Sequence, residues 1–170
     1  MIIFKIIDVI GYSGSGKTFF ITTTIKLLKE KLDFNVAVIK NVKHHPIDKI
    51  GKDSYLFREN GASYSVIQNN HLETAIFINR KGNNIRELLQ WLNNGPYKID
   101  LLLTEGFRNL HHPTVLCVSK FEDIQDQFNE SINMISGIIC VKGVDKEIYM
   151  NLPILDIQKN FSEFLEIFNF

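Results

Sequence analysis

The sequence predicts an α/β protein in which a mostly parallel sheet is covered by helices on both faces. Two observations support this fold class. Short apolar, β-branched segments alternate along the chain with segments whose apolar residues recur at helical spacing. A glycine-rich loop also separates the first apolar segment from the first helical one. The chain has 170 residues, enough for one full α/β core, so we expect residues 1–170 to form a single domain.

The first strand and the first helix are predicted on either side of that loop. An apolar run from Ile2 to Ile10, interrupted by Lys5 and Asp8, is typical of a buried strand. The next segment predicts a helix over about residues 17–32, because its apolar side chains recur at i, i+4, i+7 and i+11: Ile21, Ile25, Leu28 and Leu32.

The loop itself, residues 11–18, reads Gly-Tyr-Ser-Gly-Ser-Gly-Lys-Thr and matches the phosphate-binding loop pattern. Its glycines let main-chain N–H groups approach phosphate oxygens, and the helix that follows adds the positive end of its dipole. A chance Gly/Ser-rich turn is the alternative, but strand, loop and helix all occur in the required order. The loop therefore predicts a P-loop NTPase-like three-layer sandwich. The residues expected to bind the nucleotide are Gly11, Ser13, Gly14, Ser15, Gly16, Lys17 and Thr18, with the Thr18 hydroxyl also a ligand of Mg²⁺.

The remaining segments continue the alternation. Strands are predicted at residues 34–40, 100–105, 115–119, 135–141 and 154–155, and helices at about 85–92 and 161–168. Residues 63–68 and 74–79 flank a polar turn at 69–71 and are expected to form an antiparallel strand pair. The polar stretch 121–133 fits no single element.

A carboxylate that orients a nucleotide-bound metal is expected at the end of a strand neighbouring the loop. Ligands of a parallel sheet gather at the carboxyl ends of its strands. Glu105 ends the strand at residues 100–105, whereas Asp100 lies roughly 16 Å upstream, at the opposite edge. We therefore assign Glu105 to catalysis and to the metal, with a loop or helix-capping carboxylate as the alternative, and Asp100 to strand entry.

The segment after the second predicted strand is rich in charged residues. Lys43, Asp48, Lys52 and Asp53 suit a loop that contacts the outer phosphate and its metal. From this set we assign Asp48 to catalysis and Lys52 and Asp53 to nucleotide binding. Asp53 can equally be the N-cap of a short helix that ends at residues 60–61.

Two histidine pairs, His44-His45 and His111-His112, receive no assigned role. Zinc binding by the first pair is disfavoured, because adjacent side chains point in different directions and no cysteine is near.

Composition narrows the compartment and the partners. Lysine plus arginine equals aspartate plus glutamate at 19 each, so we expect no nucleic-acid partner. The longest apolar run stops after about ten residues, short of the roughly twenty that span a bilayer, and no secretion signal is visible, so no membrane association is expected. Cys117 and Cys140 lie in apolar segments, where reduced, buried thiols are expected. The protein is therefore placed in the cytoplasm.

These residues resemble a known family, the B protein of molybdopterin-guanine dinucleotide biosynthesis, a small GTP-binding adaptor often written MobB. The resemblance rests on the loop at 11–18, on Val-Ile-Lys at 38–40, on Gly-Lys-Asp-Ser at 51–54 with Asp48 before it and Arg58 and Gly-Ala at 61–62 after it, and on Glu-Gly-Phe-Arg at 105–108. Beyond residue 108 only the order of strands and helices agrees. This sequence departs from the family pattern at Asn41, at Pro46 and after Arg108.

The resemblance implies binding of GTP and Mg²⁺, formation of a homodimer, and assistance to the molybdopterin guanylyltransferase, the enzyme that attaches GMP to molybdopterin. Molybdopterin itself is a further candidate partner. The residues alone do not choose the base, because no Asn/Thr-Lys-x-Asp loop is present. Residues 142–145, Lys-Gly-Val-Asp, stand in a suitable place with a spacing one residue too long, and a plain turn is the alternative.

Two other functional classes use the same loop. A small-molecule kinase needs clustered arginines on a lid, whereas the arginines of this chain are scattered along it: Arg58, Arg80, Arg86 and Arg108. A metallochaperone-type GTPase would carry a Cys/His metal site. With no water-positioning glutamine or arginine finger evident, we expect GTP hydrolysis to be slow at most.

Overall fold

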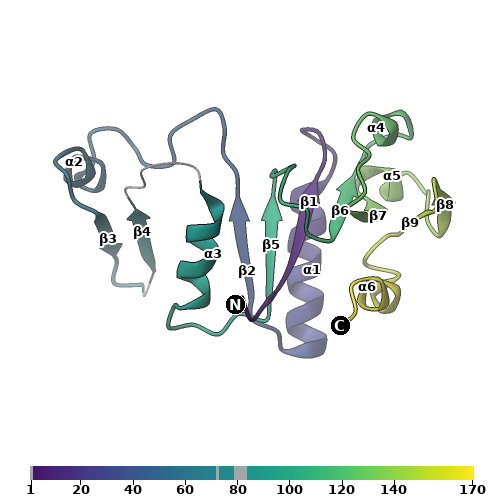
Figure 1. Cartoon of the computed structure of the whole chain (residues 1–170), viewed down its shortest axis with the longest axis horizontal. Coiled ribbons are helices and arrows are strands. Elements are labelled where there is room, and N and C mark those ends of the chain that lie inside the picture. The colour runs from purple at the N-terminus through teal and green to yellow at the C-terminus, as the bar shows by residue number, and fades with distance from the viewer. Residues whose placement is uncertain (1, 72, 79–83) are drawn as a thin grey trace. The chain divides into compact units, whose positions relative to one another are not determined.

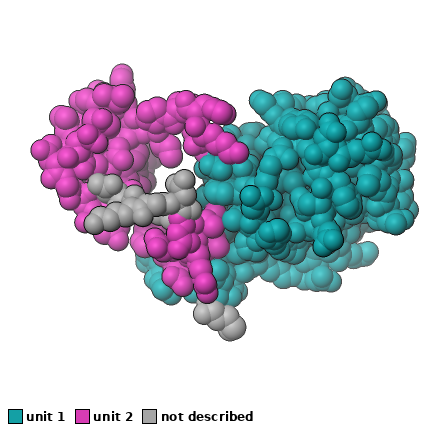
Figure 2. Space-filling model, turned by 45° about the horizontal axis from the view of Figure 1, so that its top comes forward, with its two compact units in different colours: residues 1–41, 93–170 teal, residues 42–92 magenta. Residues whose placement is uncertain are grey.

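The computed structural model describes residues 2–71, 73–78 and 84–170 (Figure 1). The chain divides into two compact units, drawn in teal and magenta in Figure 2. The large unit comprises residues 1–41 and 93–170, and the small unit comprises residues 42–92. The expectation of one domain over residues 1–170 stays a prediction, and each unit is described by itself.

The large unit contains a seven-stranded sheet in the order β2-β5-β1-β6-β7-β9-β8. Every pairing is parallel except that of β8 with β9, which confirms the mostly parallel sheet. The strands are β1 (Lys5–Ile10), β2 (Val36–Lys40), β5 (Leu101–Glu105), β6 (Thr114–Cys117), β7 (Ile132–Ser136), β8 (Glu147–Tyr149) and β9 (Leu152–Ile154).

Helices cover both faces of this sheet and complete the predicted three layers. The first face packs against α1 (Lys17–Leu32) and α6 (Phe161–Ile167), in a core that contains Val9, Leu28 and Phe164. The second face packs against the short α4 (Glu122–Gln125) and α5 (Ile138–Val141), in a core that contains Ile10. Because side chains alternate along a strand, neighbouring residues Val9 and Ile10 belong to opposite layers.

The small unit contains the predicted antiparallel pair, β3 (Tyr64–Gln68) and β4 (Thr74–Ile78). It also contains α2 (Asp53–Glu59), and α3 (Ile85–Asn93) ends at its boundary. Helix α2 has Lys52 as its N-cap, so Asp53 is its first helical residue and not the cap. Asn79, predicted as the end of the second strand, and Arg80 lie outside the described residues.

The prediction of a strand over residues 135–141 is wrong. Strand β7 ends at Ser136, and α5 begins at Ile138. Gly137 separates them with a φ of 101°, a conformation that does not continue a strand. The run Ile138–Val141 is uniformly apolar, and a short apolar run fits a buried helix as well as a buried strand.

Two smaller elements also differ from expectation. The ambiguous stretch 121–133 contains α4 and the start of β7, and β8 was not predicted. No helix in the described part of the chain combines the length and apolar character needed to cross a bilayer.

Candidate functional site

The phosphate-binding loop joins β1 to α1 at the carboxyl end of the sheet. Gly11 has a φ of 146°, and a Cβ atom there would lie 2.2 Å from the Cys117 carbonyl oxygen. Only glycine lets the loop pass this close to the end of β6. The backbone of the loop is therefore set by its packing against the neighbouring strand.

The junction of β7 and α5 supports the loop from the other side. The Ile138 N–H donates a hydrogen bond to the Ser15 carbonyl oxygen at 3.0 Å. A Cβ on Gly137 would lie 2.3 Å from that same oxygen. Gly137 is thus a site residue that the sequence analysis missed. The only signal for it was a glycine inside an apolar run.

Two polar side chains of the loop are poised for an anion. The Lys17 Nζ donates hydrogen bonds to the Gly11 carbonyl at 3.0 Å and to the Tyr12 carbonyl at 2.7 Å, so its charge is held over the loop. Ser15 is only 2% exposed, and its hydroxyl makes no hydrogen bond within the described part of the chain. A buried donor without a partner is costly, and a phosphate oxygen would satisfy it.

The loop opens onto a pocket of about 360 Å³ at the carboxyl end of the sheet. Ser13, Gly14, Gly16, Lys17 and Thr18 line it together with Glu105 from β5 and Lys40 from β2. The structure therefore brings Glu105 to the loop, as the order of strand ends predicted.

Glu105 is nearly buried in this pocket, and the Lys40 Nζ lies 3.2 Å from its Oε1 atom. Lys40 had no role assigned from the sequence. Asp100 lies at the amino end of β5, where its carboxylate accepts a hydrogen bond from the Asn35 N–H. That bond, together with one from Lys98, holds the pKa of Asp100 below its usual range, and the residue's place at strand entry is as predicted.

The small unit holds the other predicted site residues. Asp48 is buried and accepts hydrogen bonds at 2.9 Å from the Ser54 hydroxyl and from the Arg58 guanidinium, which anchors the preceding loop to α2. Lys52 and Asp53 start α2. Their assignments to catalysis and nucleotide binding stay predictions.

The loop after β5 adds contacts that the sequence did not reveal. The Arg108 guanidinium lies over the Tyr12 ring at 5.5 Å and donates a hydrogen bond to the Gln127 side chain. Asp8, which interrupts the apolar run of β1, accepts hydrogen bonds from the Thr104 hydroxyl at 2.7 Å and from the His112 N–H. Its carboxylate also lies 3.2 Å from the His112 ring. Asp8 thus holds the start of β6 against β1.

Both cysteines are buried and free, as predicted. Burial raises the pKa of the Cys117 thiol far above its usual range, although the nearby Lys17 ammonium acts in the opposite direction. Burial likewise raises the pKa of the Cys140 thiol to about 11. Neither thiol is an available nucleophile or metal ligand at neutral pH.

The described residues contain no cluster of three or more His, Cys, Asp or Glu side chains able to hold a metal ion. The candidate site is the loop pocket, whose lining includes the oxygen-bearing side chains of Thr18 and Glu105; their assignment to a metal stays a prediction.

Comparison with known proteins decides the family. The family model described as "Molybdopterin guanine dinucleotide synthesis protein B", or MobB, matches residues 6–140. The chain belongs to this family. The matched residues include the phosphate-binding loop and the two charged residues that line its pocket, Lys40 and Glu105.

Curated relatives and solved structures agree with this assignment. A putative molybdopterin-guanine dinucleotide biosynthesis adapter protein of Methanocaldococcus jannaschii is 32% identical over 136 residues, which are 77% of this chain and 54% of the relative. The adapter protein of Haemophilus influenzae is 33% identical over 65% of this chain and 61% of its own length. The match thus spans little more than half of these relatives. The crystal structure of Bacillus subtilis MobB shares the fold, with a TM-score of 0.70 and 24% identity over 97% of this chain and 98% of that one.

Proposed function

We propose that the protein is a GTP-binding adaptor of molybdenum cofactor biosynthesis, which assists the attachment of GMP to molybdopterin. The observation that carries the proposal is the pocket in which the phosphate-binding loop meets Glu105. The names of the curated relatives supply the pathway. A protein with this role would act in the cytoplasm, with the molybdopterin guanylyltransferase as its partner and molybdopterin as a further candidate.

In this proposal the phosphates of GTP take the place that the loop prepares for an anion. The main-chain N–H groups of residues 11–16 and the Ser15 hydroxyl donate to phosphate oxygens, and Lys17 turns from its own loop to the outer phosphates. The loop loses little conformational entropy when it binds phosphate, because Gly137 and Ile138 already hold it in place.

The pocket also fits Mg²⁺. Thr18 offers a hydroxyl and Glu105 a carboxylate, the hard oxygen ligands that this ion prefers, and the ion would neutralise phosphate charge. Lys40 balances the Glu105 charge until the ion binds, through an ion pair that is partly exposed. Among the described residues, those that line the pocket include no glutamine or arginine, which supports slow hydrolysis at most.

Lys17→Ala tests the site. Removing the ammonium should weaken GTP binding by about a hundredfold or more, as expected for hydrogen bonds to a charged group. Calorimetric titration with and without Mg²⁺ measures this, and Lys26→Ala on the exposed part of the same helix is the matched control. Unchanged affinity in Lys17→Ala would remove the nucleotide site from the proposal.

The adaptor role needs a second assay. Purified protein should stimulate guanylylation of molybdopterin by the guanylyltransferase at limiting GTP, and Lys17→Ala should not. Preference for ATP over GTP, or no stimulation by a protein that binds GTP, would contradict the role while leaving the fold intact.

We also infer that the protein is a homodimer, through the exposed face of the β3–β4 pair. Val66 and Ile76 lie directly opposite each other in the register, and both side chains are about half exposed, as is Tyr64 on the same face. A two-stranded sheet with an uncovered apolar face is marginal in water and gains stability when that face is buried. A second copy of the chain would supply that cover.

A further inference from the structure

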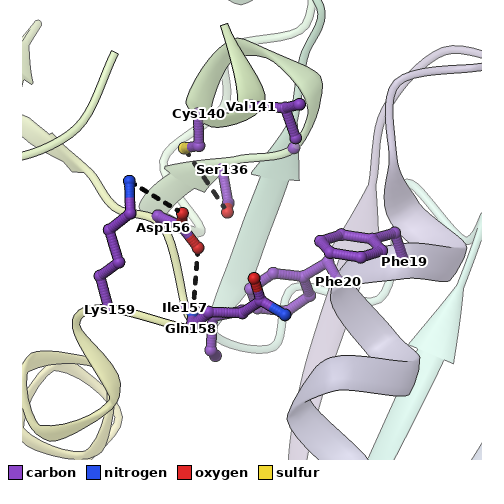
Figure 3. A pocket seen from close by; sticks show the side chains of 10 residues that line it. Phe19, Phe20, Ser136, Cys140, Val141, Asp156, Ile157, Gln158 and Lys159 are labelled. Carbon is purple, nitrogen blue, oxygen red and sulfur yellow. Dashed lines mark hydrogen bonds and ion pairs between the residues drawn. The ribbon is translucent and has the colours of Figure 1, made fainter. Parts of the chain in front are cut away.

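A second cavity of about 260 Å³ adjoins the phosphate pocket within the large unit (Figure 3). Phe19 lines both cavities. Gly137 lines the second cavity, and its neighbour Ile138 lines the phosphate pocket. Whole small-molecule sites are usually about 300–1,000 Å³, so the second cavity, at about 260 Å³, suits one part of a ligand that also occupies the phosphate pocket. A ligand whose phosphates occupy the first would place its remaining part in the second.

The walls of this second cavity differ in character. Phe19 and Phe20 from α1 form one side, and the segment Asp156 to Lys159 that follows β9 forms the other (Figure 3). Phe20 and Ile157 are buried, whereas Phe19 is half exposed and its ring is available for stacking. A flat aromatic group fits between an aromatic wall and a polar one.

Asp156 is held rigidly on the polar side. Its N–H donates to the Asp145 carboxylate at 2.8 Å, and its own Oδ1 accepts the Gln158 N–H at 3.0 Å. Its carbonyl oxygen accepts the N–H groups of Lys159 and Asn160. The carboxylate position is therefore set before any ligand arrives.

The other carboxylate oxygen of Asp156 has accepting capacity left. The Lys159 Nζ lies 3.5 Å from Oδ2, and that lysine is largely exposed, so the pair is weak. A carboxylate has about four lone-pair sites, and those still open can accept two parallel N–H groups from a ligand.

We propose that this cavity is the nucleobase subsite and that Asp156 selects guanine. The N1–H and 2-amino groups of guanine are two adjacent donors, which match a carboxylate. Adenine presents an acceptor at N1, which a carboxylate repels. The proposal rests on the proposed function, since it requires a nucleoside triphosphate in the loop pocket.

The same geometry gives Asp145 a role other than direct contact with the base. Its Oδ1 accepts the Asp156 N–H and the Asn160 side-chain amide at 2.7 Å. Burial alone would raise the pKa of Asp145, but these hydrogen bonds outweigh it and lower the pKa. Asp145 is therefore a positioning residue for Asp156.

Asp156→Asn tests the proposal by exchanging one acceptor for a donor while keeping the shape. Xanthine carries a carbonyl where guanine carries the 2-amino group. The amide of the Asp156→Asn variant should therefore bind GTP more weakly and XTP more tightly than the wild-type carboxylate does. Calorimetry should show GTP binding weakened and XTP binding tightened, each by about tenfold to a hundredfold. Affinity for inorganic tripolyphosphate, which has no base, should not change. Asp33→Asn, at the far end of α1, is the matched control.

A second variant keeps the test decisive if the first lowers stability. Phe19→Ala should weaken GTP binding by about tenfold or more through lost stacking, with tripolyphosphate binding retained. If wild-type protein binds neither GTP nor tripolyphosphate, the proposed function fails. If it binds GTP but Asp156→Asn leaves the GTP to XTP ratio unchanged, or Phe19→Ala weakens both ligands equally, only the nucleobase subsite is overturned.

Discussion

Glu105 and Lys40 form an opposite-charge pair inside the pocket beside the phosphate-binding loop. Their separation of 3.2 Å neutralises a nearly buried carboxylate without fixing it, because the lysine side chain is about half exposed. In the proposed complex, a divalent ion would compete for the same carboxylate, and phosphate oxygens would offer Lys40 a new partner. We therefore expect the pair to link metal binding to phosphate binding.

Glu105→Gln should therefore weaken the Mg²⁺ dependence of GTP binding. The amide keeps the size of the side chain but loses the charge that attracts the ion, and we expect the Mg²⁺-dependent part of the affinity to fall by about tenfold. Titration with GTP across a range of Mg²⁺ concentrations measures this. Glu163→Gln, on α6, is the control. A Glu105→Gln protein that unfolds instead would show a structural role for the carboxylate.

The two thiols should be nearly inert in the folded protein. At pH 8 a thiol with a pKa of about 11 is thiolate in roughly one molecule in a thousand. We expect Cys117 and Cys140 to react with an aromatic disulfide reagent only after unfolding in guanidinium. Because the folded pKa values are raised, reactivity should grow as pH rises toward 11. Rapid labelling of native protein at pH 8 would contradict the buried state.

At the scale of elements, the β7–α5 junction supports the phosphate-binding loop through Gly137. Gly137→Ala should cost about 1–3 kcal/mol more than Gly143→Ala, because the new methyl group meets the Ser15 carbonyl. Gly143 has a similar φ of 99° and nothing within 4 Å of the place where a Cβ would lie, so it is the control without the clash. Urea unfolding measures the difference. Equal costs would mean that the loop is not braced there.

Elements with one clear periodicity were predictable from the sequence. The segment from β1 through the loop to α1 was predictable, because a β-branched apolar run, a motif and a regular helical spacing agree there. Residues 135–141 were not, because the apolar run at 138–141 is too short to show a period that separates strand from helix. Glu105 could be placed at the loop from strand direction alone. Lys40 at the loop pocket and Asp156 at the second cavity could not, because their positions depend on the order of strands in the sheet.

At the scale of the whole molecule, the exposed face of β3 and β4 predicts the oligomeric state. Val66→Lys should convert a dimer into a monomer, because it places a charge at the centre of the apolar face. Sedimentation equilibrium should then show half the mass, with an unchanged circular dichroism spectrum. Ile148→Lys, at an even more exposed position on β8, should leave the mass unchanged. Loss of dimer in the control, or none in Val66→Lys, would move the interface elsewhere.

The division of the chain has a topological consequence. The small unit is inserted between β2 and β5, which are hydrogen-bonded neighbours in one sheet. The Asn41 N–H donates a hydrogen bond to the Glu105 carbonyl at the carboxyl end of β5. The Asn93 side-chain oxygen accepts one from the Ile3 N–H, just before the amino end of β1. The inserted segment therefore leaves the sheet at the carboxyl ends of its strands and returns to it at their amino ends. It is an elaborated crossover connection, and a tight turn cannot replace it, since a parallel crossover needs about a dozen residues or more.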